Sequence, residues 1–90
     1  MFKANGKLLE CRAEALKTEF AAVSRRVVRM MWEKMAACGS ELGFEHVEAV
    51  LGLLKNGSSG KMLALPGKTA AAYFYGMLYV GAQPEVKKIN

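Results

Sequence analysis

The longest stretch without a helix-breaking residue constrains this chain most. Residues Lys7 to Cys38 contain neither proline nor glycine, the two residues that most strongly oppose a helix interior. Asn5 suits an N-cap, and Gly39 suits a helix stop. Apolar residues recur at the i, i+4, i+7 spacing that holds them on one helical stripe: Leu9, Ala13, Leu16, Phe20, Val23, Val27 and Met30. We therefore predict one long N-terminal helix over Lys7–Cys38.

The second half of this predicted helix carries more apolar surface than one stripe. A helix of about 48 Å is long for a 90-residue chain, whose expected radius of gyration is about 12 Å. Either the rest of the chain buries the extra surface, or the surface lies on a membrane or meets a partner, because Met and Trp fill irregular contacts well. We expect a contact with a second copy or another protein through Val28, Met31, Trp32 and Met35.

A second helix is predicted after Gly39. Ser40 suits its N-cap, and Lys55-Asn56-Gly57 suits its end. The apolar positions follow helical spacing and are Phe44, Val47, Val50, Leu51 and Leu54. Because the connection to the first helix is short, we expect the two helices to pack antiparallel.

The apolar segment Ala70–Ala82 fits two structures. Its alanine triplet and length favour a third helix, whereas its aromatic and β-branched residues favour a strand paired with Met62–Leu65. We predict a mainly α fold with a single helical domain over residues 1–82. The alternative is an α+β fold with a C-terminal β-hairpin at about 61–80. Residues 83–90 are predicted to form a mobile tail.

Basic residues offer the sharpest binding hypothesis. The chain has a net charge of +5 and a pI near 9.4, which is consistent with an acidic or nucleic-acid partner. Arg25, Arg26 and Arg29 lie beside Trp32, away from the core stripe, so they are candidates for clamping phosphates while the indole stacks. Lys68 is a candidate for the same kind of anion patch, beside amides near Thr69. The alternatives are a protein-binding patch and a solvated face in which Arg29 pairs with Glu33.

Catalytic and metal-binding patterns are not found. The segment from Leu65 to Thr69 resembles part of a phosphate loop, but Pro66 has no amide and the first required glycine is replaced by Met62, which argues against nucleotide hydrolysis. His46, the single histidine, is expected on the surface, and no metal-ligand spacing surrounds it. We predict no catalytic residue, no metal and no cofactor.

The cysteines and the hydropathy pattern bear on location. Cys11 and Cys38 would lie too far apart on one helix for a disulfide, so free thiols in a reducing cytoplasm are expected. The N-terminus lacks the apolar run of a signal peptide, and no segment reaches the roughly 20 apolar residues of a transmembrane helix.

The leading functional hypothesis is therefore a small, non-enzymatic, homo-oligomeric protein-interaction module, such as an accessory or inhibitor protein of a phage or mobile element. The first alternative is a small basic nucleic-acid-binding regulator. The second is a small-ligand binder at a subunit interface.

Overall fold

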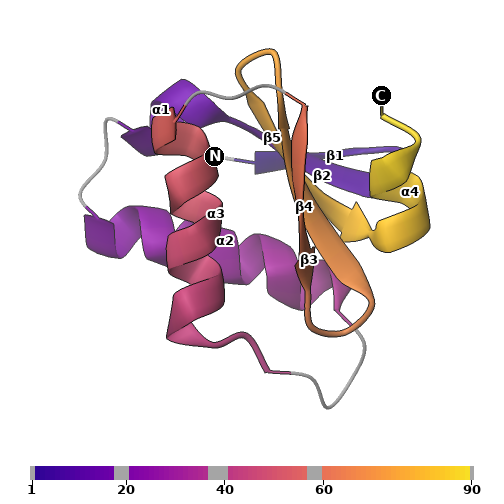
Figure 1. Cartoon of the computed structure of the whole chain (residues 1–90), viewed down its shortest axis with the longest axis horizontal. Coiled ribbons are helices and arrows are strands. Elements are labelled where there is room, and N and C mark those ends of the chain that lie inside the picture. Colours follow the sequence, from indigo (N-terminus) through magenta and orange to yellow (C-terminus); the bar gives the residue numbers. More distant parts are fainter. Residues whose placement is uncertain (1, 18–20, 37–40, 57–59, 90) are drawn as a thin grey trace.

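The computed structural model describes residues 2–17, 21–36, 41–56 and 60–89, and its centre is a five-stranded antiparallel sheet (Figure 1). The strand order is β1-β2-β5-β4-β3. Helices α1, α2 and α3 lie on one face of the sheet and α4 lies on the other (Figure 1). The elements in chain order are β1 (Phe2–Asn5), β2 (Leu8–Arg12), α1 (Ala13–Lys17), α2 (Ala21–Met35), α3 (Phe44–Asn56), β3 (Lys61–Leu65), β4 (Thr69–Phe74), β5 (Met77–Ala82) and α4 (Gln83–Lys87). The fold class is α+β, and the prediction of a mainly α fold is wrong.

The N-terminal half of the predicted long helix is a β-hairpin followed by a short helix. Asn5 pairs with Leu8 across a two-residue loop, in which Gly6 has a φ of +63°, a conformation that suits glycine at the start of such a loop. Within β2, Leu9 and Cys11 are buried and Arg12 is exposed, which is the period of two expected of a strand. The turn that begins at Gly6 therefore outweighs the helical spacing of the apolar residues.

The second half of that stretch is helical, but its buried face differs from the predicted stripe. Val28 and Met31 are fully buried, whereas Met30, assigned to the core stripe, is 44% exposed. The Trp32 side chain is 6% exposed, and its Nε1–H donates a hydrogen bond to the carbonyl oxygen of Pro66 at 3.0 Å. The apolar surface that was predicted to contact a partner is thus the surface by which α2 packs on the sheet and on α3. Phe20, Cys38, Gly39 and Ser40 lie outside the described residues.

Helix α3 agrees with the predicted second helix, although its packing differs. Val47, Val50 and Leu54 are buried at 1% exposure or less, whereas Phe44 is 61% exposed. Helices α2 and α3 cross at a steep angle, so the expected antiparallel pair is wrong (Figure 1). At the start of α3 the amide of Gly43 donates to Nδ1 of His46 at 3.1 Å, so this histidine satisfies an otherwise unpaired amide.

The C-terminal half forms two successive β-hairpins. Strands β3 and β4 pair from Leu65–Thr69 to Lys61–Tyr73, so the alternative with a hairpin in this region describes this part of the chain better. Yet the segment expected as one helix or one strand is two strands, β4 and β5. The alanine triplet from Ala70 to Ala72 is fully buried at the centre of the sheet, where packing overrides the helix propensity of alanine. No helix begins at Thr69.

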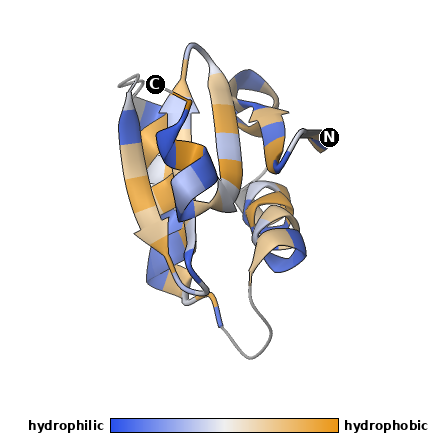
Figure 2. Ribbon diagram, turned by 90° about the vertical axis from the view of Figure 1, so that its right-hand side faces the viewer, coloured by the Kyte–Doolittle hydropathy of each residue, from blue (hydrophilic) through white to orange (hydrophobic). Residues whose placement is uncertain are grey.

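Side chains of the sheet alternate between two apolar cores. Ala71, Leu78 and Val80 join the main core under α1–α3, while Ala70 and Ala72 meet Val86 of α4 on the other face. In Figure 2 much of the sheet is hydrophobic, whereas the helices carry both hydrophobic and hydrophilic residues. Val86 is 1% exposed, although it belongs to the segment expected to be a tail. The mobility of that segment stays a prediction.

Two neighbouring methionines test the buried face of α2. Replacing the buried Met31 by alanine leaves a cavity, so we expect Met31→Ala to lower the free energy of unfolding by about 2–5 kcal/mol. The matched control Met30→Ala removes a side chain that is 44% exposed and should change the free energy of unfolding by less than about 0.5 kcal/mol. Chemical denaturation of both variants measures this; a larger loss from Met30→Ala would place the core on the predicted stripe instead.

Two glycines test the packing of β5 against β2. A Cβ at Gly81 would lie 2.5 Å from Cδ2 of Leu8 and 3.3 Å from the carbonyl oxygen of Lys7. We therefore expect Gly81→Val to lower the free energy of unfolding by about 1–3 kcal/mol. A Cβ at Gly52 in α3 would meet nothing within 4 Å. Gly52→Ala should therefore raise the free energy of unfolding by about 0.5–1 kcal/mol. Thermal denaturation of both variants is the measurement, and a stabilising Gly81→Val would contradict the close approach of the strands.

Candidate functional site

The turn between β4 and β5 brings separate parts of the chain together at one end of the molecule. Its two residues, Tyr75 and Gly76, have φ values of +48° and +80°, the left-handed pair required by a type I′ hairpin turn. The amide of Ala13 donates to the carbonyl oxygen of Gly76 at 2.9 Å. This bond fixes the end of β2 and the start of α1 against the turn, from which Tyr75 projects with 91% of its surface exposed.

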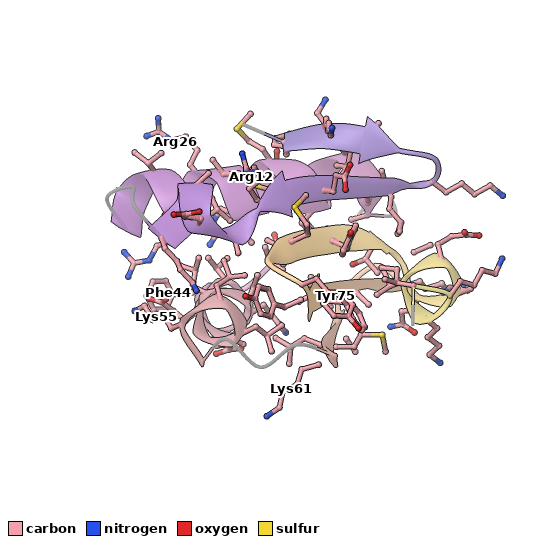
Figure 3. All side chains as sticks on the ribbon, turned by 90° about the horizontal axis from the view of Figure 1, so that it is seen from above. Arg12, Arg26, Phe44, Lys55, Lys61 and Tyr75 are labelled. Carbon is pink, nitrogen blue, oxygen red and sulfur yellow. The ribbon has the colours of Figure 1, made fainter. Side chains whose placement is uncertain are left out.

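Four exposed basic residues from four elements lie around this turn. Arg12 ends β2, and Lys17 lies in the last turn of α1. Lys55 lies in the last turn of α3, and Lys61 begins β3. We call these four residues and Tyr75 the hairpin-end face; Figure 3 labels its members apart from Lys17, viewed from above.

Shared cavities and strand register connect the members of the hairpin-end face. Arg12, Lys17 and Tyr75 line one open cavity of about 530 Å³. Lys17 also lines a second cavity, of about 180 Å³, together with Lys55. Lys61 is the cross-strand partner of Tyr73, whose side chain lines the first cavity. Shared cavities therefore connect β2, α1 and α3, and the strand register places Lys61 beside Tyr73.

The face is positively charged and carries an aromatic ring. The ammonium group of Lys17 lies 6.0 Å from the centre of the Tyr73 ring, within the range of a cation–π contact. Glu14 is the acidic residue of the larger cavity, and Glu48 in the smaller one is bound by Arg25 at 2.6 Å. The larger cavity is thus lined by two cations, Arg12 and Lys17, and by the carboxylate of Glu14, while Lys55 lines the smaller one. Such a surface can hold phosphates while an exposed ring stacks on a base.

Two arginines of the predicted patch contact other parts of the chain. Arg25 pairs with Glu48 and lies 5.2 Å from the centre of the Phe44 ring. Arg29 donates from Nη1 to the carbonyl oxygen of Leu42 at 3.0 Å. Both side chains therefore brace α2 against α3 and the segment before it. Arg26 is exposed on α2, and anion binding by these residues stays a prediction.

Lys68, the fourth predicted anion-binding residue, lies apart from the arginines. It is exposed in the loop between β3 and β4, with a φ of +60°. This loop lies at the end of β4 opposite to the Tyr75 turn (Figure 1). The structure thus does not bring Lys68 together with the basic residues of α2.

The predicted contact residues lie largely inside the fold. Val28 and Met31 are fully buried, Trp32 is 6% exposed, and Met35 is half-buried against the main core. Since the chain covers these side chains itself, the reasoning that a second copy must cover them is wrong. The indole of Trp32 is also buried and hydrogen-bonded to the carbonyl oxygen of Pro66, so it is not exposed for stacking on a base.

Two observations concern reactive groups in the described part of the chain. Burial raises the pKa of the Cys11 thiol above its ordinary value, which disfavours the nucleophilic thiolate. Cys38 lies outside the described residues. Within the described ranges, no group of three or more His, Cys, Asp or Glu residues is placed to hold a metal ion. In the same part of the chain, no helix has the length and apolar character needed to cross a bilayer.

Sequence reasoning missed most of the hairpin-end face. Arg12 and Lys17 fall inside the predicted long helix and were not singled out, and Lys55 was assigned to a helix end. These residues are far apart in the sequence, and the fold brings them together. The Tyr75-Gly76 pair between alternating apolar residues was the available signal, because glycine at the second loop position is typical of type I′ turns.

Comparison with known proteins gives two matches. The family model described as the TilS substrate binding domain matches residues 12–79. A tRNA(Ile)-lysidine synthase from Caldanaerobacter subterraneus subsp. tengcongensis is 32% identical over 86 residues, which cover 96% of this chain and 18% of that enzyme. The chain thus spans less than a fifth of the length of this relative. No solved structure matches.

These matches correct the predicted function. The hypothesis of a non-enzymatic, homo-oligomeric interaction module from a phage or mobile element is wrong, because the matched family and the relative both concern an enzyme. The alternative of a basic nucleic-acid binder agrees better with these findings. The family model covers well over half of the chain, and the chain therefore belongs to the family of TilS substrate-binding domains.

Proposed function

We propose that this chain is the substrate-binding part of an enzyme of the tRNA(Ile)-lysidine synthase type, and that it binds tRNA through the hairpin-end face. The observation that carries the proposal is the convergence of Arg12, Lys17, Lys55 and Lys61 around the exposed Tyr75. The name of the relative supplies the class of ligand, and the charge of this face suits it. A tRNA ligand also implies that the chain works in the cytoplasm.

Counterion release supplies the driving force for this binding. Each lysine or arginine that neutralises a phosphate frees condensed cations, so affinity falls as salt concentration rises. The four cations are exposed to solvent on helices and strands of the fold, where a phosphate chain can reach them. Arg25, in contrast, would have to release Glu48, to which it is bound at 2.6 Å. The hairpin-end face is thus better suited to bind the phosphate backbone of RNA than the arginines of α2 are.

Substitution of single lysines tests the proposal. We expect binding of a tRNA(Ile) transcript at low salt, with a plot of log affinity against log salt whose slope is about −3 to −4 for four phosphate contacts. Lys17→Gln and Lys55→Gln should each weaken binding and reduce the magnitude of the slope by about 1. Fluorescence anisotropy over a salt series measures both quantities.

A charge-matched control separates the face from net charge alone. Lys87 is exposed on α4, on the opposite side of the sheet, so Lys87→Gln should leave both affinity and slope nearly unchanged. Arg26→Gln tests the surface of α2 that the sequence singled out. The proposal would be refuted by a lack of binding at low salt, or by an equal loss from Lys87→Gln and Lys17→Gln.

A further inference from the structure

The smaller of the two cavities lies between helices α1, α2 and α3 and has a volume of about 180 Å³. Its apolar wall consists of Leu16, Leu51 and Leu54, whose side chains are at most 9% exposed. The hydroxyl of Ser24 also belongs to the lining and donates to the carbonyl oxygen of Leu16 at 2.7 Å. Because this bond ties α2 to α1, the wall of the cavity has a fixed shape.

Charged groups line the same cavity. Lys17 and Lys55 are exposed, whereas Arg25 and Glu48 are half-buried. Nη2 of Arg25 donates to Glu48 at 2.6 Å, so the carboxylate of this lining already has a cationic partner. Three positive charges around one cavity repel one another, and an anion bound there would relieve the repulsion. The cavity is therefore suited to a ligand that carries a negative charge.

The size of the cavity and its polar groups narrow the class of ligand. Sites for drug-sized molecules have volumes of about 300–1,000 Å³, so this cavity suits a single planar ring system with an anionic group attached. The leucines can contact the faces of such a ring. A guanidinium has five N–H donors and a carboxylate has two accepting oxygens, so Arg25 and Glu48 can bond to the polar edge of the ring without separating. A nucleotide has the required apolar faces, polar edge and phosphate.

We propose that this cavity takes up one unpaired base of the bound RNA, while Lys17 and Lys55 hold the phosphate beside it. The inference rests on the proposed function and adds a pocket for a single nucleotide. Both lysines belong to the hairpin-end face, so a phosphate chain bound along that face runs beside the cavity. Bases in an A-form duplex are paired and stacked, so the base that enters must come from a loop, a bulge or an end.

Titration of the natural chain with small probes tests whether the cavity binds a nucleotide. We expect adenosine monophosphate to shift the backbone amide signals of Ser24, Glu48 and Leu51 in nuclear magnetic resonance spectra of the isotope-labelled chain. Inorganic phosphate lacks the base and should bind more weakly. Adenosine lacks the hydrogen bonds to charged groups and should bind about tenfold more weakly or worse.

Two neighbouring arginines of α2 give a matched pair of variants. Arg25→Lys keeps the charge beside Glu48 but loses the planar fork of donors. Its affinity for adenosine monophosphate, and for an RNA hairpin with an unpaired loop, should fall about 2- to 12-fold, as expected for loss of one hydrogen bond. Arg26 is exposed on the same helix and is not part of the cavity lining, so Arg26→Lys should leave both affinities nearly unchanged.

Salt dependence and a paired RNA separate this role from a structural one. Arg25→Lys removes no charge, so it should keep the salt slope, whereas Lys55→Gln should reduce it. Binding of a fully paired RNA of the same length should be nearly insensitive to Arg25→Lys, because no base of a duplex enters the cavity. A variant that merely destabilised the fold would weaken binding of both RNAs. Anisotropy with both RNAs measures these quantities.

The outcomes distinguish failure of this inference from failure of the proposed function. If the natural chain binds RNA in a salt-dependent way but adenosine monophosphate shifts no amide of the cavity lining, the inference is overturned and the proposed function stands. Equal affinities for inorganic phosphate and adenosine monophosphate, or equal losses from Arg25→Lys on hairpin and paired RNA, would also overturn the inference. If the natural chain binds neither RNA at low salt, the proposed function fails as well.

Discussion

The pairing of β2 with β5 is the interaction on which the rest of the structure depends. It joins the two ends of the chain in a register that runs from Leu8–Gly81 to Arg12–Met77. Gly81 leaves room for the side chain of Leu8, whose Cδ2 would lie 2.5 Å from a Cβ at this position. The pairing also places the apolar residues of the N-terminal hairpin beside those of β5 in one core under the helices. Without it, β1, β2 and α1 would have no sheet to complete.

The same pairing creates the hairpin-end face. It brings Arg12 to the strand that begins two residues after Tyr75, and the bond from Ala13 to Gly76 then positions α1 with Lys17. Sequence reasoning recognised that basic residues mattered but selected those adjacent in sequence. Arg25 and Arg29 proved to have partners inside the fold. The residues of the face are joined by non-local pairing, which local sequence patterns do not report.

The parts of the fold that were predicted are those set by local spacing. Helix α3 and the helical character of α2 follow from apolar periodicity, and the β3–β4 hairpin was the stated alternative. The error in the first half arose because Leu9, Ala13 and Leu16 fit both a helix and the observed strand followed by a short helix, and all three are buried. The error in the second half arose because an alanine triplet favours a helix unless tightly packed layers enclose it. In both places the decisive signal was a turn containing glycine.

The pairing of β2 with β5 can be observed directly by nuclear magnetic resonance of the isotope-labelled chain. The account predicts interstrand nuclear Overhauser effects between β2 and β5, in the register that sets Cys11 opposite Leu78 and Glu10 opposite Tyr79. It also predicts extended backbone shifts for residues 8–12. Helical sequential contacts across residues 8–12, with no contact between Cys11 and Leu78, would contradict the account of both the fold and the site.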